Sequence, residues 1–209
     1  MKSKNLQLER TVFFSDAVIA IAITLLALEL KVEPGKNKDL YFSDIFMQWQ
    51  TFVAFLLSFI NIASFWKTHH TFFAHINKID NRLLLYNFIW LFFIVLVPFS
   101  TSLFGNHLFS QAAVTTYSIN ILFVTIFQNL LWDYASKIND YKKLETNDSF
   151  FRSELHIYCN LDMVNSILAV FLSFINPTLA FVLLYTKFPV LLVVILFYRN
   201  KKRRKKRRK

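Results

Sequence analysis

Six long runs of apolar residues, separated by short polar stretches, dominate the pattern of the chain. They are Thr11–Leu30, about Ile45–Trp66, Leu83–Phe104, about Ala112–Trp132, about Leu155–Ile175 and Leu179–Tyr198. Each run is close to the roughly 20 residues that an α-helix needs to cross a hydrocarbon core about 30 Å thick. The pattern predicts an all-α integral membrane protein with six transmembrane helices per subunit.

Helix-breaking and polar residues mark the ends of these runs. Pro34 and Gly35 follow the first run, the second has a helical continuation to about Ile76, and Gly105 ends the third. Asn176-Pro177-Thr178 forms a tight turn before the sixth.

The sixth run is the least regular, because Lys187 and Pro189 lie near its middle. Proline removes a helical hydrogen bond, so we expect this segment to be kinked or partly interfacial. A snorkelling or cavity-facing lysine fits Lys187 better than a functional one.

Composition agrees with a membrane protein, since 55% of the 209 residues are hydrophobic and 25 are Phe. The net charge of +11 does not indicate a nucleic-acid-binding face, because ten basic residues lie in the segment Arg199–Lys209 and the rest of the chain is almost neutral. We therefore divide the chain into a six-helix membrane domain, residues 1–198, and a basic cytoplasmic tail, residues 199–209. The tail either contacts anionic lipid and enforces orientation or is a solvated segment.

Positive charge between the runs sets the orientation, because Lys and Arg favour the cytoplasmic side. With six spans, one side receives Lys2, Lys4, Arg10, Lys67, Lys78, Arg82, Lys137, Lys142, Lys143, Arg152 and the tail. The other side receives only Lys31, Lys36 and Lys38. Both termini are therefore expected to be cytoplasmic.

The first run has two chemically different sides. At about 100° per residue, Phe14, Leu25 and Leu28 fall within about 40° of Ile21, and Thr24 lies at the edge of this stripe. Ser15 and Asp16 fall about 120° or more away from Ile21.

Ser15 and Asp16 have two possible roles. An acid within a span normally faces a partner inside the bundle, and Trp66, His69 and His70 at the end of the second run reach the same side of the membrane. A hydrogen-bonded network of Arg10, Ser15, Asp16, Trp66 and one or both histidines would lock the two helices together. The alternative is that Ser15 and Asp16 cap a helix in the interfacial region.

The apolar stripe around Ile21 is also open to two interpretations. Such a stripe usually packs against other helices or lipid. The functional alternative is a pore constriction, where apolar rings gate by tight fit or by dewetting.

The polar and apolar positions together resemble a known family. Arg10-x-x-x-Phe14-Ser15-Asp16 followed by AVIAIAITLLALEL is similar to the first-helix signature of the transmembrane-protein-175 family of potassium channels, in its single-unit bacterial form. Further matching segments are Ser64–His70, Asp80, Leu83–Leu85 and Val97–Leu103. The first half of the chain carries this resemblance, and the second half matches only in hydropathy.

The resemblance implies a homotetramer in a prokaryotic plasma membrane, with the first helices lining a central pore and no re-entrant pore loop. It implies that Ile21 forms the narrowest ring, that Leu25 and Leu28 form further apolar rings, and that Thr24 helps to coordinate potassium. It implies a structural role for Arg10, Phe14, Ser15 and Asp16, with Trp66 and the His69/His70 pair. The implied function is a potassium-selective leak channel.

The residues set limits on other functions. The only two glycines, Gly35 and Gly105, lie outside any TVGYG-like filter, so potassium selection would fall to side chains on helices. No metal-site spacing, phosphate loop or nucleophile motif is visible, so we expect no enzyme activity, no cofactor, no bound metal beyond permeating K⁺ and no nucleic-acid partner. The alternative function is a proton-coupled or other secondary carrier with Asp16 and His69/His70 as a relay. The direction in which Asp16 faces distinguishes the two.

Overall fold

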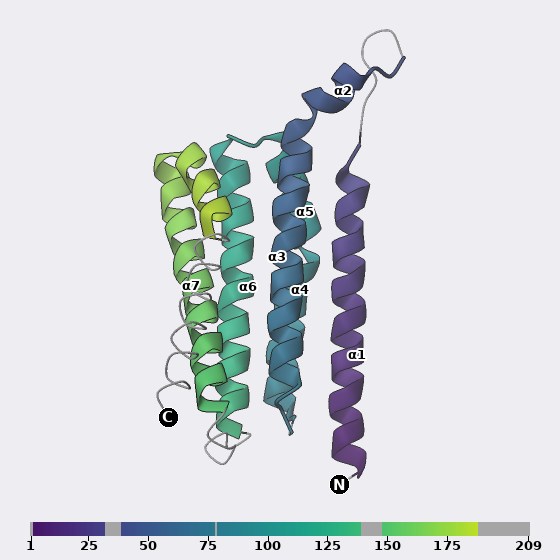
Figure 1. The fold of residues 1–209 in the computed structure, drawn as a ribbon, viewed down its shortest axis with the longest axis vertical. Helices are drawn as coiled ribbons and strands as arrows, with labels where there is room; N and C mark the ends of the chain where they lie inside the picture. Colours follow the sequence, from purple (N-terminus) through teal and green to yellow (C-terminus); the bar gives the residue numbers. More distant parts are fainter. Residues whose placement is uncertain (1, 32–38, 78, 139–147, 188–209) are drawn as a thin grey trace, which may run out of the picture.

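The computed structural model describes residues 2–31, 39–77, 79–138 and 148–187. Long helices run side by side along one direction, and the short helix α2 (Phe42–Met47) lies at one end of them (Figure 1). The described residues contain helices and connecting turns and no β-strand. The predicted all-helical class is therefore confirmed.

Four helices in the described part of the chain are long and apolar enough to cross a membrane. They are Leu6–Glu29, Trp49–Phe73, Asn81–Asn106 and Gln111–Ile138. The apolar part of the fifth, Cys159–Ile175, is shorter, and the sixth run is described only as a helix over residues 177–187. The count of six spans remains a prediction, and Pro189 and the tail lie outside the described residues.

The first helix is longer than its apolar run. Helix α1 covers Lys2–Leu25 and tightens into a 3₁₀ turn, η1, over Leu26–Glu29. It therefore begins before the predicted start at Thr11, because the polar residues that precede the apolar run continue the same helix.

The second run is divided at Gln48 into α2 and α3 (Trp49–Phe73). Helix α3 continues past Trp66 to Phe73. It therefore covers most of the predicted extension, which ran to about Ile76. This continuation places Trp66, His69 and His70 on one helix.

The third run forms one apolar span, Asn81–Asn106, as predicted, but its helix is interrupted at Leu96. Helix α4 covers Asn81–Val95, α5 covers Val97–Asn106, and Leu96 joins them. Pro98 lies in the first turn of α5, where its missing N–H and its ring are tolerated. The proline therefore explains the break that the unbroken apolar pattern concealed.

Gly105 does not end the third run as predicted, because it is helical and buried. A Cβ at this position would lie 3.2 Å from Thr51 Cα and 3.3 Å from Ala54 Cβ. The absence of a side chain thus allows α5 to approach α3 closely, and the helix ends one residue later at Asn106.

Helices α6 (Gln111–Ile138) and α7 (Asp148–Ile175) pack against each other, and a further helix over residues 177–187 follows α7. Both α6 and α7 extend beyond their predicted apolar runs. The amide N–H of Leu179 donates to Asn176 Oδ1 at 3.1 Å, so Asn176 caps residues 177–187 and confirms the predicted turn.

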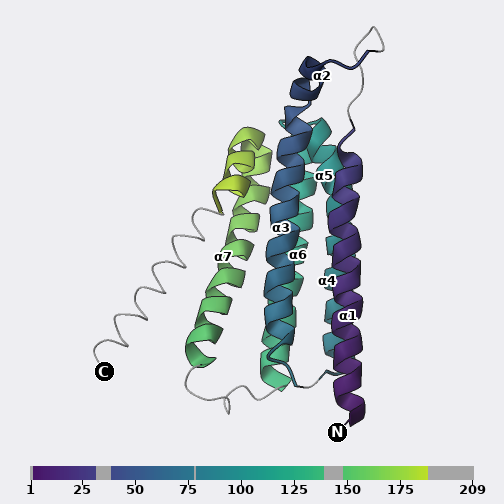
Figure 2. The ribbon, with the colours of Figure 1, turned by 45° about the vertical axis from the view of Figure 1, so that its right-hand side comes forward.

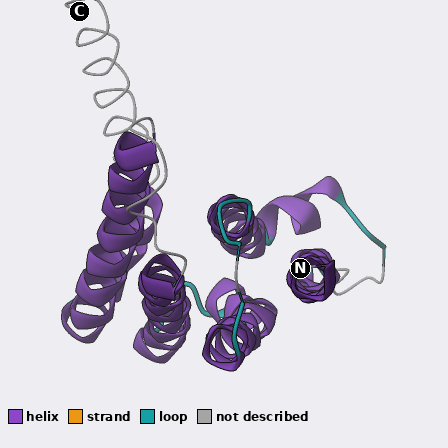
Figure 3. Cartoon of the chain, turned by 90° about the horizontal axis from the view of Figure 1, so that it is seen from below, coloured by secondary structure: helices purple, strands orange, loops and turns teal. Residues whose placement is uncertain are grey.

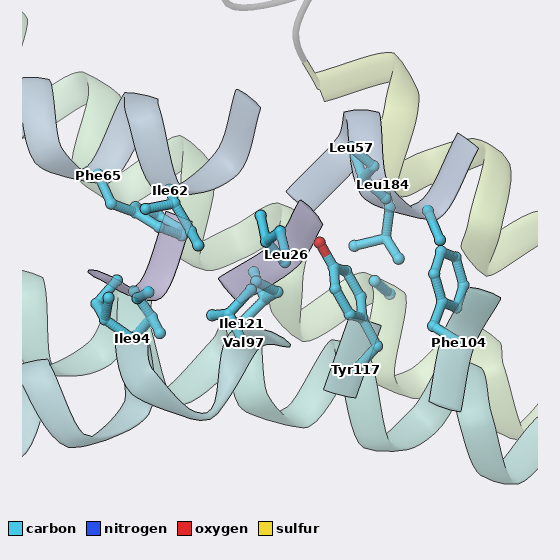
Figure 4. Close-up of a cluster of buried hydrophobic side chains, with 14 of the residues drawn as sticks. Leu26, Leu57, Ile62, Phe65, Ile94, Val97, Phe104, Tyr117, Ile121 and Leu184 are labelled. Carbon is cyan, nitrogen blue, oxygen red and sulfur yellow. The ribbon is translucent and has the colours of Figure 1, made fainter. Parts of the chain in front are cut away.

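Helix α1 stands at the edge of the bundle and contacts α3 and α4, whereas α6 contacts α4, α5 and α7 (Figures 2 and 3). The main buried cluster joins residues of all the long helices, including Leu26, Leu57, Ile94, Tyr117 and Leu184 (Figure 4). A second cluster around Phe72 and Trp132 lies between α3 and α6.

Candidate functional site: the first helix and its polar anchor

One face of α1 packs into the protein and the opposite face is exposed. Ser15, Ile19, Ala22 and Leu26 are buried, as is Thr11. At about 100° per residue these positions lie on the side opposite the Ile21 stripe. Packing of α1 within the subunit therefore turns the stripe outward.

The residues of the predicted constriction are all exposed in the single subunit. The exposed fractions are 60% for Ile21, 38% for Leu25 and 65% for Leu28. Thr24 is also exposed, and its hydroxyl donates to the backbone oxygen of Ile21 at 2.8 Å. The stripe is thus available to lipid or to other copies of the chain and does not form part of the subunit core.

Asp16 faces α3. The indole Nε1–H of Trp66 donates to Asp16 Oδ1 at 2.9 Å. The His70 ring lies against the Trp66 ring, with centroids 5.5 Å apart. The carboxylate is therefore directed toward α3 and away from the exposed stripe, at a partly exposed position.

Ser15 is bound from the other side, by α4. Asn87 Nδ2 donates to Ser15 Oγ at 2.9 Å, and Asn87 Oδ1 lies 2.8 Å from His69 Nε2. Since the Asn87 amide already donates to Ser15, the His69 nitrogen is the donor in the second contact. A buried hydrogen-bonded chain thus joins α1, α4 and α3.

His69 and His70 have separate roles in this arrangement. His69 is buried between the rings of Trp90 and Phe73, at centroid distances of 4.6 and 4.3 Å. His70 is exposed beside Trp66. The predicted network did not include Asn87. An asparagine within an apolar run does not show in the sequence which side chains its amide will bind, here Ser15 and His69.

Arg10 is not part of the described network, contrary to the prediction. Its side chain is exposed and lines a cavity of about 340 Å³ between α1 and α4, with Phe14 and Phe88 among the other lining residues. The Phe14 and Phe88 rings meet edge to face at 5.8 Å. Arg10 lies on the same side of α1 as the Ile21 stripe, which explains why it does not reach Asp16.

The alternative in which Ser15 and Asp16 cap α1 is wrong. Helix α1 begins at Lys2, so both residues lie well inside it. The Ser15 hydroxyl donates to the backbone oxygen of Thr11, one helical turn earlier, at 2.8 Å. Both side chains therefore act between helices.

A second buried polar network, missed by the sequence reasoning, joins α3, α5 and α6. The Tyr117 hydroxyl accepts hydrogen bonds from Ser58 at 3.1 Å and from Asn61 at 2.9 Å. Thr101 donates to Ser58 at 2.7 Å. Small polar residues within apolar helices often make such interhelical bonds, and they are the one signal that could have found this network.

Within the described ranges, no group of three or more His, Cys, Asp or Glu side chains is placed to hold a metal ion. The polar groups gathered around α1 are hydrogen-bonding pairs. These hydrogen bonds can fix the rotation of α1 about its axis. The exposed stripe is the face of α1 that remains available for contact with other molecules.

Comparisons with known proteins show which proteins this chain resembles in sequence and in fold. The family model described as "Endosomal/lysosomal potassium channel TMEM175" matches residues 10–98. A potassium channel of Chamaesiphon minutus is 35% identical over 128 residues, which cover 59% of this chain and 63% of that protein. A potassium channel of Chryseobacterium sp. is 34% identical over 118 residues, covering 56% and 59%. The match thus spans about three fifths of the length of these relatives.

More distant relatives carry a different activity in their names. The rat endosomal/lysosomal proton channel TMEM175 is 30% identical over 139 residues, which cover 61% of this chain and 28% of that protein. These relatives are all named as ion channels, in agreement with the expectation that the chain is not an enzyme.

Solved structures extend the similarity beyond the matched sequence. The crystal structure of a lysosomal potassium-selective channel TMEM175 homologue from Chamaesiphon minutus has a TM-score of 0.73 and 27% identity, and the match covers 93% of this chain and 97% of that one. The crystal structure of a variant of the potassium channel MtTMEM175 has a TM-score of 0.65 and 19% identity, over 91% of this chain and 93% of that one, and shows the shared fold. The first-helix motif, the contacts that it makes and the fold therefore agree in their similarity to the TMEM175 family.

Proposed function

We propose that this chain is a potassium-selective channel subunit whose pore is lined by α1. One observation carries the proposal: the apolar stripe of α1 is exposed, with Ile21 60% accessible, while the opposite face is held by α3 and α4. A helix with one fixed face and one open apolar face suits a position around a shared axis. The choice of potassium as the permeating ion is based on relatives that are named potassium channels.

The proposed assembly is a homotetramer of six-span subunits without a re-entrant loop, in a bacterial cell membrane with both termini cytoplasmic. Four α1 helices would then bring Ile21, Leu25 and Leu28 together as apolar rings, with Thr24 beside Ile21. The hydroxyl and carbonyl oxygens at Thr24 and Ile21 are the groups that could contact a partly dehydrated cation, since potassium selection relies on oxygen ligands.

The direction of Asp16 supports a channel over a coupled carrier. A relay carboxylate would have to face the permeation path, but Asp16 accepts a hydrogen bond from Trp66 on α3. His69 is enclosed between aromatic rings and also lies away from the stripe. Structural roles for Asp16 and the histidines fit these contacts.

Reconstitution of the purified chain in planar bilayers under a potassium/sodium gradient tests the function. We expect ohmic single-channel steps that reverse near the potassium potential. Small, saturating currents that require a proton gradient would instead support the carrier, and a reversal potential that follows pH would support a proton channel.

Ile21→Asn tests the constriction. An amide at the narrowest apolar ring lets water remain in the pore, so we expect a larger leak and a potassium/sodium permeability ratio reduced severalfold, without loss of the tetramer. Ile119→Asn on α6 is the matched control, because Ile119 is also an exposed isoleucine, at 37%. Equal effects of the two substitutions would argue against a special role for Ile21.

A further inference from the structure

Two opposite charges meet inside the bundle, between α7 and the helix that follows it. Lys187 Nζ lies 3.4 Å from Asp162 Oδ1, and the two side chains are only 3% and 14% exposed. Charged side chains within a span are unfavourable in hydrocarbon and normally mark a specific role. Lys187 therefore does not snorkel to the membrane surface. It faces a cavity, which was the other expectation for this residue.

In the proposed six-span arrangement, with the turn at Asn176 at one membrane surface, the pair lies at depth in the membrane. Asp162 precedes the end of α7 at Ile175, and Lys187 follows the turn at Asn176. At 1.5 Å per helical residue, both lie roughly 15–20 Å from that turn, which is about half the thickness of a bilayer core. Neither charge reaches the headgroup region near the turn.

Lys187 also joins its helix to α3. Its ammonium lies 5.4 Å from the centre of the Phe65 ring, a distance at which a cation is attracted to the ring face. The Tyr185 hydroxyl donates to the backbone oxygen of Val53, also on α3. Leu184 and Leu57 of α3 belong to the main buried cluster (Figure 4).

Packing is incomplete beside the ion pair. A cavity of about 210 Å³ is lined by Asp162, Asn165, Thr186, Lys187 and neighbouring apolar residues. This space is half open to the outside of the subunit, so the ion pair lies beside a gap between the two helices. A buried ion pair contributes little net stability over an apolar pair but can specify one arrangement.

Phe65 connects this arrangement to the pore helix. The next residue, Trp66, donates the hydrogen bond that holds Asp16 on α1. We propose that the Asp162–Lys187 ion pair is an intramembrane clamp that fixes residues 177–187 on α7, holds the Lys187 ammonium over Phe65 of α3 and thereby positions Trp66 to orient α1. Lys187 and Asp162 are positioning residues in this scheme. The clamp extends the proposed channel function, and its link to α1 rests on that function.

The experiment combines two readouts on protein in lipid nanodiscs or bilayers. Hydrogen–deuterium exchange of a peptide covering residues 177–187 reports the docking of this helix. The potassium/sodium permeability ratio reports the orientation of α1. The variants are Lys187→Met, Lys187→Arg and the charge swap Asp162→Lys/Lys187→Glu, with Asp133→Asn as a control for loss of a more exposed carboxylate (56%).

For Lys187→Met we expect exchange at 177–187 to accelerate about tenfold, because Asp162 is left buried without its charge partner. We expect the permeability ratio to fall at least about threefold, since α1 is no longer held in one rotation. Lys187→Arg should restore both readouts, because it keeps a cation over the Phe65 ring. The charge swap keeps the ion pair but not that cation, so it should restore only the exchange rate, and Asp133→Asn should change neither readout.

Unchanged exchange in Lys187→Met would overturn the clamp. Faster exchange with an unchanged permeability ratio would overturn its link to α1. Failure of both charge-restoring variants would also overturn the clamp, because packing would then explain the effect. If the parent protein does not conduct potassium, the proposed channel fails, and the exchange measurement alone decides whether the ion pair docks the helix.

Discussion

Helices α1 and α6 are both long and apolar, but the subunit uses them in opposite ways. In their most apolar windows, 28% of residues are buried in the span containing α1 and 56% in α6. Helix α6 touches α4, α5 and α7, while α1 contacts α3, α4 and α5 from the edge. Both helices are apolar enough to cross a membrane, yet one is a central packing helix and the other leaves an exposed face for other molecules.

The two helices are also held by different forces. Large aromatic side chains of α6, such as Tyr117 and Trp132, are buried in the two clusters. The buried face of α1 carries smaller side chains, and directed hydrogen bonds at Ser15 and Asp16 add to its packing. This difference predicts that substitutions in α6 reduce stability, whereas substitutions around α1 mainly change its orientation.

The largest stability effect is expected for Trp132→Ala. Trp132 is 1% exposed, stacks on Phe72 at 4.6 Å and donates to His156 at 3.0 Å. Truncation of a buried aromatic side chain costs about 3–5 kcal/mol. Thermal unfolding in detergent, compared with Ile21→Ala on the open face of α1, measures the difference. Equal destabilisation by both would contradict the contrast between the helices.

Asn87→Ala should have the next largest effect. It leaves Ser15 and the buried His69 without their shared amide, which costs about 1–3 kcal/mol. The same unfolding assay measures it, with Asn106→Ala at the exposed end of α5 as the control. A loss confined to stability, with unchanged ion selectivity, would show that this bond does not orient α1.

Trp66→Phe removes one hydrogen bond and keeps an aromatic ring. We expect a loss of about 1 kcal/mol, since the Asp16 side is partly open to solvent. A double-mutant cycle with Asp16→Asn isolates the pair. Additive effects of the two substitutions would mean that the 2.9 Å contact contributes no coupling.

Acidification should produce the smallest effect, at the contact between α4 and α6. Partial desolvation acts to raise the pKa of Asp80, but hydrogen bonds from Tyr134 and the Leu83 and Arg82 amides, together with the Arg82 charge, outweigh it and leave the pKa below its ordinary value of 3.8. Because the folded-state pKa is depressed, the carboxylate's contribution is present above pH 3.8 and is lost as the pH falls below that value.

The measurement for Asp80 is the unfolding temperature of the parent protein and of Asp80→Asn between pH 6 and pH 3, in about unit steps. The difference between them should shrink as the pH falls. A difference that is constant over this range would show that ionisation of Asp80 does not stabilise the start of α4.

Periodicity and motif were sufficient to predict the two sides of α1 and the approach of Asp16 to Trp66. They did not predict the contacts of Asn87 or Asp162. The partner of a buried polar group depends on which helices become neighbours in the fold. Pro98 was visible in the sequence, but the continuous apolar run around it suggested one helix. Glycine after an apolar run usually marks a helix end, but at Gly105 the fold uses the missing side chain to bring α5 close to α3.

The 3₁₀ turn at the end of α1 changes the geometry of the leucines on the exposed stripe. With three residues per turn, side chains three positions apart lie directly above one another, and the rise is about 2.0 Å per residue. Leu25 and Leu28 flank the beginning of η1, so they approach a single line parallel to the helix axis, roughly 6 Å apart. Where α1 borders a pore, this stacking lengthens the dry section of the conduction path, and an ion must remain partly without its hydration shell over that added distance.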